Sequence, residues 1–171
     1  MRRARLGVIA TAAVVIAAAS VGVGVALAAT PLTVGSGWQQ FNWVGQTQPV
    51  EPVQTPYTFT TTKAVTLAIT DVGCPGEVFT VYDNGVLLGR TTPPTVTTCA
   101  YPGATNDPDA ALADETYSGG VGTLKPGTHS ITIIVSTGPF ENGGAFIRVD
   151  NKSDARALQS DRTVKRKKFF G

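Results

Sequence analysis

Apolar side chains recur at every second position through much of the segment 57–150, and this alternation restricts the chain to a fold built from β-strands. The run 65–70 alternates Val, Leu and Ile with Thr and Ala, and the run 129–135 places Ile and Val on one parity. Side chains of that period lie on alternate faces of a strand, so one face is expected to be buried and the other wetted. Helical spacing is nearly absent before residue 108, which argues against a parallel sheet with crossover helices.

Turn residues divide this segment into short strands. Asn84-Gly85 lies between two apolar runs and predicts a type I′ hairpin, because both central residues of that turn need positive φ. One helical turn is expected at 109–115, with Asp109 as its N-cap. Strands are expected at 38–44, 57–62, 63–71, 78–82, 86–90, 116–124, 129–135 and 145–150. Seven or eight antiparallel strands of this spacing are typical of an all-β sandwich or jelly roll.

The first 28 residues have the composition of a secretory signal peptide. Three arginines precede the uncharged apolar run 6–27, and Ala26-Leu27-Ala28 offers an A-x-A cleavage site. The apolar run is also about long enough to cross a bilayer, which needs roughly 20 residues, so a retained anchor is the alternative. We predict cleavage, a secreted product that is not attached to a membrane, and a segment 29–56 that forms an arm and the first strand.

Charge is distributed unevenly along the rest of the chain. The segment 29–150 holds four Lys and Arg against ten Asp and Glu, whereas the tail, residues 151–171, holds seven basic and two acidic residues. The acidic segment argues against a nucleic-acid partner, whose phosphates need a basic groove. The tail has little apolar content and is expected to be disordered or weakly helical. The basic tail has three interpretations: a solvated terminus, a tether to anionic envelope polymers, or a remnant of processing.

The two cysteines, Cys74 and Cys99, both lie in the exported part, where an even count favours a disulfide. Such a bond would close a loop of 25 residues and add about 3.5 kcal/mol to stability in the chain-entropy model. Two separate thiols are the alternative. No basic cluster flanks either cysteine to make it a reactive thiolate.

Several short motifs follow one another in a distinctive order across 37–150. Among them are Gly37-Trp38-Gln39-Gln40-Phe41, Asp107-Pro108-Asp109-Ala110, Gly127-Thr128-His129-Ser130-Ile131 and Gly144-Ala145-Phe146-Ile147. In this order they resemble a group of uncharacterised secreted bacterial proteins, with fungal relatives, related to the bodies of some PEP-CTERM-tailed exported proteins. The resemblance implies a galactose-binding-like β-sandwich at 57–150 with 37–56 packed on it, and no assigned activity. The chain lacks the Pro-Glu-Pro sorting motif, so free secretion is favoured.

Catalytic chemistry has few candidates in this sequence. His129 is the only histidine and hence the only imidazole base, and by strand parity it lies with Ile131 and Ile133, which favours a partly buried structural role. No Gly-x-Ser-x-Gly motif is present, and a zinc site would need about four ligands. We therefore predict that the chain is not an enzyme.

Acidic residues gather at 107–115. The hypothesis of a calcium site assigns Asp107, Asp109 and Asp114 as ligands together with loop carbonyls, since Ca²⁺ takes 6–8 oxygens. The favoured alternative is that these residues cap turns. A secreted hydrolase that uses two carboxyls of this region is the alternative function. No other cofactor is expected.

Aromatic residues offer a binding surface for sugar rings. Trp43, Tyr101 and Tyr117 are the tentative ligand-binding residues, although aromatics at period two more often pack in a core. Trp38 and Trp43 have opposite parity, so one of the two can face solvent. The sequence thus predicts a secreted, non-catalytic binding or structural surface module, with a glycan or cell-envelope polymer as its possible partner.

Overall fold

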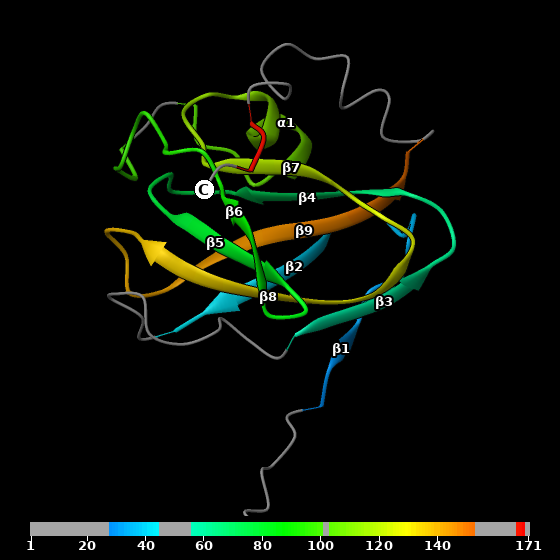
Figure 1. Cartoon of the computed structure of the whole chain (residues 1–171). Helices are drawn as coiled ribbons and strands as arrows, with labels where there is room; N and C mark the ends of the chain where they lie inside the picture. The colour runs from blue at the N-terminus through cyan, green and yellow to red at the C-terminus, as the bar shows by residue number, and fades with distance from the viewer. Residues whose placement is uncertain (1–27, 45–55, 101–102, 153–166, 170–171) are drawn as a thin grey trace, which may run out of the picture.

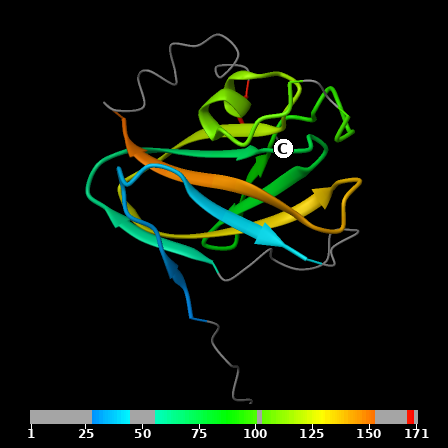
Figure 2. The same ribbon diagram turned by 180° about the vertical axis from the view of Figure 1, so that it is seen from behind.

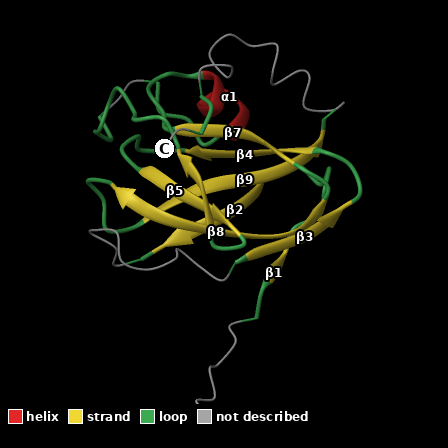
Figure 3. Cartoon of the chain, viewed as in Figure 1, coloured by secondary structure: helices red, strands yellow, loops and turns green. Residues whose placement is uncertain are grey.

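The computed structural model describes residues 28–44, 56–100, 103–152 and 167–169. The regular elements of the described part are β-strands and one short helix, joined by loops (Figure 1, Figure 3). Its elements are β1 (Thr30–Pro31), β2 (Gln39–Trp43), β3 (Tyr57–Thr61), β4 (Val65–Asp71), β5 (Val78–Asp83), β6 (Val86–Arg90), α1 (Pro108–Ala113), β7 (Gly119–Leu124), β8 (Gly127–Thr137) and β9 (Gly143–Asn151). The all-β prediction is confirmed. The expected signal peptide falls almost wholly on residues 1–27, outside the described residues.

Two sheets face each other as a sandwich. One has the strand order β1-β3-β8-β5-β6 and the other has the order β2-β9-β4-β7. From β2 onward every connection passes to the other sheet, except the β5–β6 hairpin. The eight strands β2 to β9 thus have the arrangement of a jelly roll, as expected. The two views of Figure 1 and Figure 2 show the layers from opposite sides.

The apolar interior between the sheets is built by the predicted alternation. Phe79 and Val81 of β5 are buried with Ile131 and Ile133 of β8. Across from them, Phe41 of β2 packs edge-on to Phe79 with ring centroids 5.6 Å apart. Side chains of one parity from both sheets thus form one core.

The β5–β6 hairpin has the predicted turn. Asn84 has φ of 49° and Gly85 has φ of 78°, so both central residues lie in the left-handed region. This is the backbone that a type I′ turn requires. His129 lies beside this hairpin, buried, with Nδ1 2.7 Å from Asp83 Oδ2 and Nε2 donating to the Lys125 carbonyl at 3.0 Å. Its ring stacks on Phe59, so its role is the structural one that was predicted.

Three expectations about local structure are wrong. β4 is buried on both faces, not wetted on one, because α1 covers its outer face and Leu112 packs against Ala68. The helix begins at Pro108, and Asp107 rather than Asp109 is its N-cap, accepting from two backbone N–H groups. A ninth strand, the two-residue β1, pairs in parallel with β3. A strand of two residues is too short to show an alternation of apolar and polar residues in the sequence.

The tail also departs in part from the expectation of a disordered terminus. Lys167 is buried, and Lys168 forms a parallel bridge with Val121 of β7. Residues 153–166 lie outside the described part. Among the described helices, none is long and apolar enough to cross a membrane.

Candidate functional site

The three acids of the calcium hypothesis are each engaged in hydrogen bonds, which are local for Asp107 and Asp114. Asp107 caps α1, and Asp114 Oδ1 accepts from the Thr116 N–H at 2.8 Å just after the helix. Asp109 Oδ1 accepts from the distant Trp38 Nε1 at 3.0 Å and from Arg148 at 3.1 Å. The described residues contain no group of three or more His, Cys, Asp or Glu side chains able to hold a metal ion. Asp107 and Asp114 thus have the capping role of the alternative interpretation, whereas Asp109 joins α1 to Trp38 and Arg148.

Two of the three aromatic residues predicted to bind a ligand are buried. Tyr117 is fully buried: its hydroxyl accepts from the Thr105 N–H and donates to the Gly73 carbonyl, which ties two loops together. Tyr101 lies outside the described residues. Trp43 is only 3% exposed and packs in the core. The two tryptophans differ in exposure, as their opposite parity predicted. Trp38 is the partly exposed one, and the guanidinium carbon of Arg148 lies 5.0 Å from the centroid of its ring.

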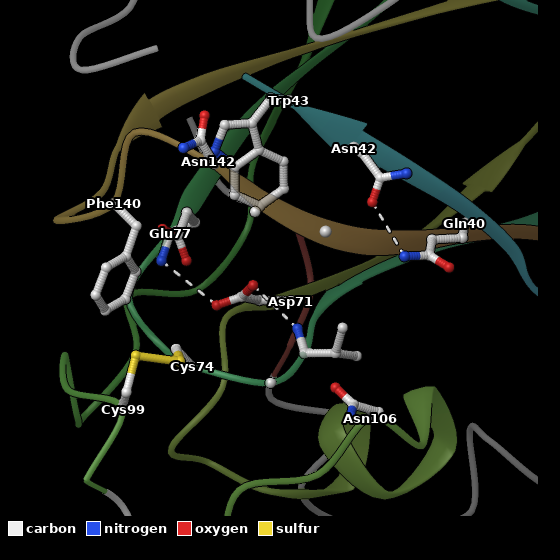
Figure 4. A pocket seen from close by; sticks show the side chains of 14 residues that line it. Gln40, Asn42, Trp43, Asp71, Cys74, Glu77, Cys99, Asn106, Phe140 and Asn142 are labelled. Carbon is white, nitrogen blue, oxygen red and sulfur yellow. Dashed lines mark hydrogen bonds between the residues drawn. A yellow bond between two sulfur atoms is a disulfide. The ribbon is translucent and has the colours of Figure 1, made fainter. Parts of the chain in front are cut away.

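A pocket of about 320 Å³ lies where β4 ends, between β2, the disulfide loop and the β8–β9 loop. That volume is at the lower end of the range of about 300–1,000 Å³ typical of small-ligand sites. Side-chain amides, two aromatic rings, the disulfide and two buried carboxyls surround it (Figure 4). The main lining residues are Gln40, Asn42, Trp43, Asp71, Cys74, Glu77, Cys99, Asn106, Phe140 and Asn142. We call this the Asp71 pocket.

Asp71 is at the centre of these residues, and the chain turn after β4 wraps around its carboxyl group. Oδ1 accepts from the Val72 N–H at 3.0 Å, and Oδ2 accepts from the N–H groups of Gly76 and Glu77 at 3.1 and 3.4 Å. These three donors hold the carboxyl in place. Asp71 is 1% exposed. Asp71 thus organises the 72–77 loop through these hydrogen bonds. From the sequence, Asp71 was expected only to end a strand.

Glu77 forms a buried acidic pair with Asp71. Burial raises the pKa of Glu77 to about 7, against the lowering effect of hydrogen bonds from Asp71 and from the Phe140 backbone. Burial likewise raises the pKa of Asp71 well above its ordinary value, with the charge of Glu77 adding to the rise. Two carboxyls so placed titrate as a pair. Below a pH of about 7 the pair therefore retains a proton that solvent-exposed acids would have lost.

Two residues that line the pocket each have a buried side-chain atom without a hydrogen-bond partner among the described residues. The atoms are Nε1 of Trp43 and Oε1 of Glu77. A buried polar group without a partner costs roughly 1–3 kcal/mol. Both atoms are enclosed by the protein, so this cost falls on the folded state itself.

Trp43 keeps its place through a glycine on the neighbouring strand. Gly143 pairs with Trp43 in the β2–β9 ladder, and a Cβ at Gly143 would lie 2.1 Å from Cζ2 of the indole. The ring also meets Phe79 edge-on at 5.6 Å. The indole therefore packs over the backbone of Gly143, and the rest of its surface contacts the core and borders the pocket.

The predicted disulfide Cys74–Cys99 is present and forms part of the pocket wall. It joins the loop after β4 to the long loop between β6 and α1. The bond thus fixes the loop that surrounds Asp71. From the sequence, this disulfide was expected only to add stability, and its position in the wall of the Asp71 pocket was not predicted.

Comparisons with known proteins add little beyond the fold. No protein-family model matches the chain, and no curated protein matches it in sequence. Among solved structures, it is similar to the pre-peptidase C-terminal domain of a collagenase from Bacillus anthracis, with 10% identity over 72% of this chain and 95% of that chain, and a TM-score of 0.42. The resemblance to PEP-CTERM-related secreted proteins rests on the motifs and stays a prediction.

Proposed function

We propose that this chain is an exported, non-catalytic binding module that holds one sugar residue of a glycan or cell-envelope polymer in the Asp71 pocket. The observation that carries the proposal is the lining of this ligand-sized pocket, in which four side-chain amides lie beside aromatic carbon. Binding sites for small ligands typically combine apolar surface with a few polar groups that fix the orientation of the ligand.

The polar lining favours a ligand rich in hydroxyl groups. Gln40, Asn42, Asn106 and Asn142 are amides that both donate and accept hydrogen bonds, as each sugar hydroxyl also does. Gln40 Nε2 donates to Asn42 Oδ1 at 3.0 Å, which holds the two amides side by side at one end of the pocket (Figure 4).

The lining contains aromatic carbon but no Lys or Arg, which disfavours an anionic ligand. The half-buried Phe140 presents apolar ring surface, on which the C–H face of a sugar can pack. The volume accommodates one residue of a chain rather than an extended oligomer. A terminal or branch sugar is therefore the expected ligand.

Export is supported by two observations. The disulfide requires an oxidising compartment, and the first 28 residues have signal-peptide composition.

A glycan array with the full chain, followed by calorimetric titration of the best ligand, tests the proposal. Asn142→Ala and Gln40→Ala should each weaken binding about tenfold, the effect of losing one hydrogen bond. Gln39→Ala is the matched control, because Gln39 neighbours Gln40 on β2 but does not line the pocket. Absence of binding to any glycan or envelope polysaccharide, or equal effects of Gln39→Ala and Gln40→Ala, would refute it.

A second candidate function is hydrolysis of the bound sugar, favoured by the acidic pair itself. Glycosidases use two carboxyls, one of them with a raised pKa. In this pocket both carboxyls are buried and Asp71 is held by three backbone donors, so we expect binding without turnover. Release of reducing ends from a bound glycan, abolished by Glu77→Gln, would favour the hydrolase instead.

A further inference from the structure

The edge of the sheet at β7 forms an isolated β-bridge with the tail. Lys168 pairs in parallel with Val121, and the Val121 N–H donates to the Lys167 carbonyl at 2.6 Å. β7 is the last strand of its sheet, so its outer edge would otherwise present unpaired backbone groups. This contact is independent of the Asp71 pocket.

Lys167 enters a cage of backbone carbonyls at the end of α1. Its Nζ donates to the carbonyl oxygens of Ala111, Asp114 and Tyr117 at 3.1, 2.5 and 2.9 Å, and the residue is 3% exposed. Burial lowers the pKa of Lys167 to about 8, with the charges of Asp114 and Glu115 opposing the shift. At neutral pH the ammonium group is thus still protonated, and its three N–H groups match three acceptors.

Phe169 fills a trough that glycines leave open in β7. A Cβ at Gly120 would lie 2.2 Å from the Phe169 ring, and one at Gly122 would lie 2.8 Å from it. The ring packs against the main core cluster in the space that side chains at these positions would take. The glycines that interrupt the predicted strand 116–124 are therefore explained by the close approach of the tail.

These contacts define a site for a Lys-X-Phe strand, made of the three carbonyls and the glycine trough; we call it the β7 trough. Residues 167–169 make the contacts, and they are linked to β9 through residues 153–166. A linker of 14 residues spans up to about 50 Å when extended. That exceeds the length of β8, the longest strand, whose 11 residues span about 36 Å. The same segment can therefore reach a neighbouring molecule.

We propose that the β7 trough also accepts residues 167–169 of a second copy of this chain, so that copies join through exchanged tails. Every copy carries both the trough and the segment that fits it, which makes the contact heterologous. Charge favours the exchange as well, since the segment 29–150 has ten acidic against four basic residues and the tail has seven basic against two acidic. A tail that docks on its own chain has a high effective concentration there, and this docking competes with binding to the β7 trough of another copy.

A complementary pair of full-chain variants tests the exchange directly. The first, Lys167→Gln with Phe169→Ala, has an open trough and no competent segment. The second, Gly120→Val, blocks its own trough and frees its own tail. Light scattering after size exclusion should find each variant monomeric alone, and a one-to-one complex when they are mixed. The control mixture replaces the second variant by one that also carries the two tail substitutions, and it should remain monomeric.

A mixture that stays monomeric, with both variants folded by circular dichroism, would overturn the proposal. If Gly120→Val does not fold, a labelled peptide of residues 165–170 replaces it, and fluorescence anisotropy measures binding to the first variant. The wild-type peptide should bind at least about tenfold more tightly than one with Gln in place of Lys167, since three charged hydrogen bonds are lost. Equal binding of the two peptides, or none, would likewise overturn it.

Discussion

Replacing Glu77 by glutamine should make the protein more stable at pH 8 and leave its stability at pH 4.5 nearly unchanged. Glu77 is 1% exposed, and burial raises its pKa to about 7, whereas the ordinary value is 4.5. The folded state therefore binds the Glu77 proton more tightly than the unfolded state does. The stability that this proton contributes is fully present below pH about 4.5 and is lost as pH rises through about 7.

The size of the effect follows from the shift. The difference between 4.5 and about 7, at 1.36 kcal/mol per pH unit, corresponds to about 3 kcal/mol. Because Glu77 lines a pocket, we discount this for screening by solvent to about 2 kcal/mol. Glutamine has the shape of the protonated acid and no charge to bury, and its amide can donate to Asp71. For a chain of this size, 2 kcal/mol corresponds to roughly 4–8 °C in Tm.

Thermal and urea unfolding from pH 4.5 to 8 measure the effect as the difference between Glu77→Gln and wild type. The matched control is Glu141→Gln, which removes an exposed carboxyl from the nearby β8–β9 loop and should follow the wild-type curve. Parallel curves for wild type and Glu77→Gln across the whole range would mean that the Glu77 carboxyl titrates as an ordinary exposed acid. That result would refute the account of a buried acidic pair.

Three further perturbations probe the frame of the site. Gly143→Ala should destabilise the protein by about 1–3 kcal/mol, because the added methyl overlaps Trp43, and a changed tryptophan emission spectrum would report the displaced ring. Replacing Cys74 and Cys99 together by serine should cost about 3 kcal/mol in urea unfolding; an unchanged midpoint would contradict the role of the bond in closing the 25-residue loop. Asp107→Ala should cost about 1 kcal/mol through loss of the N-cap, whereas Asp107→Asn should cost little.

The strands were predictable because each carries its own local signal. Alternation marked the buried faces of β5 and β8, and Asn84-Gly85 fixed the hairpin turn. The burial of both faces of β4 was not predictable, because it depends on α1, which is distant in sequence. The docking of Lys167 was missed for the same reason: a basic, polar segment has no periodicity, and its partners are backbone carbonyls.

The acids predicted as a candidate site are not the ones that line the Asp71 pocket. The cluster at 107–115 is dense in sequence, yet its side chains point to helix caps and to Arg148. Asp71 and Glu77 are six residues apart, and the loop between them folds back around Cys74, which brings the two carboxyls together. The available signal was the disulfide: two acids that flank a bridged cysteine are held in a fixed loop.

The strand order has a consequence for how the protein reaches its folded state. β9 lies between β2 and β4, and β8 lies between β3 and β5, so each sheet is joined by one of the last two strands to be synthesised. One sheet stays in two parts until β8, which ends at Thr137, is available, and the other until β9, which ends at Asn151. Pairings so distant in sequence form slowly. The β5–β6 hairpin can form early, but the shared core is complete only when the last two strands are inserted.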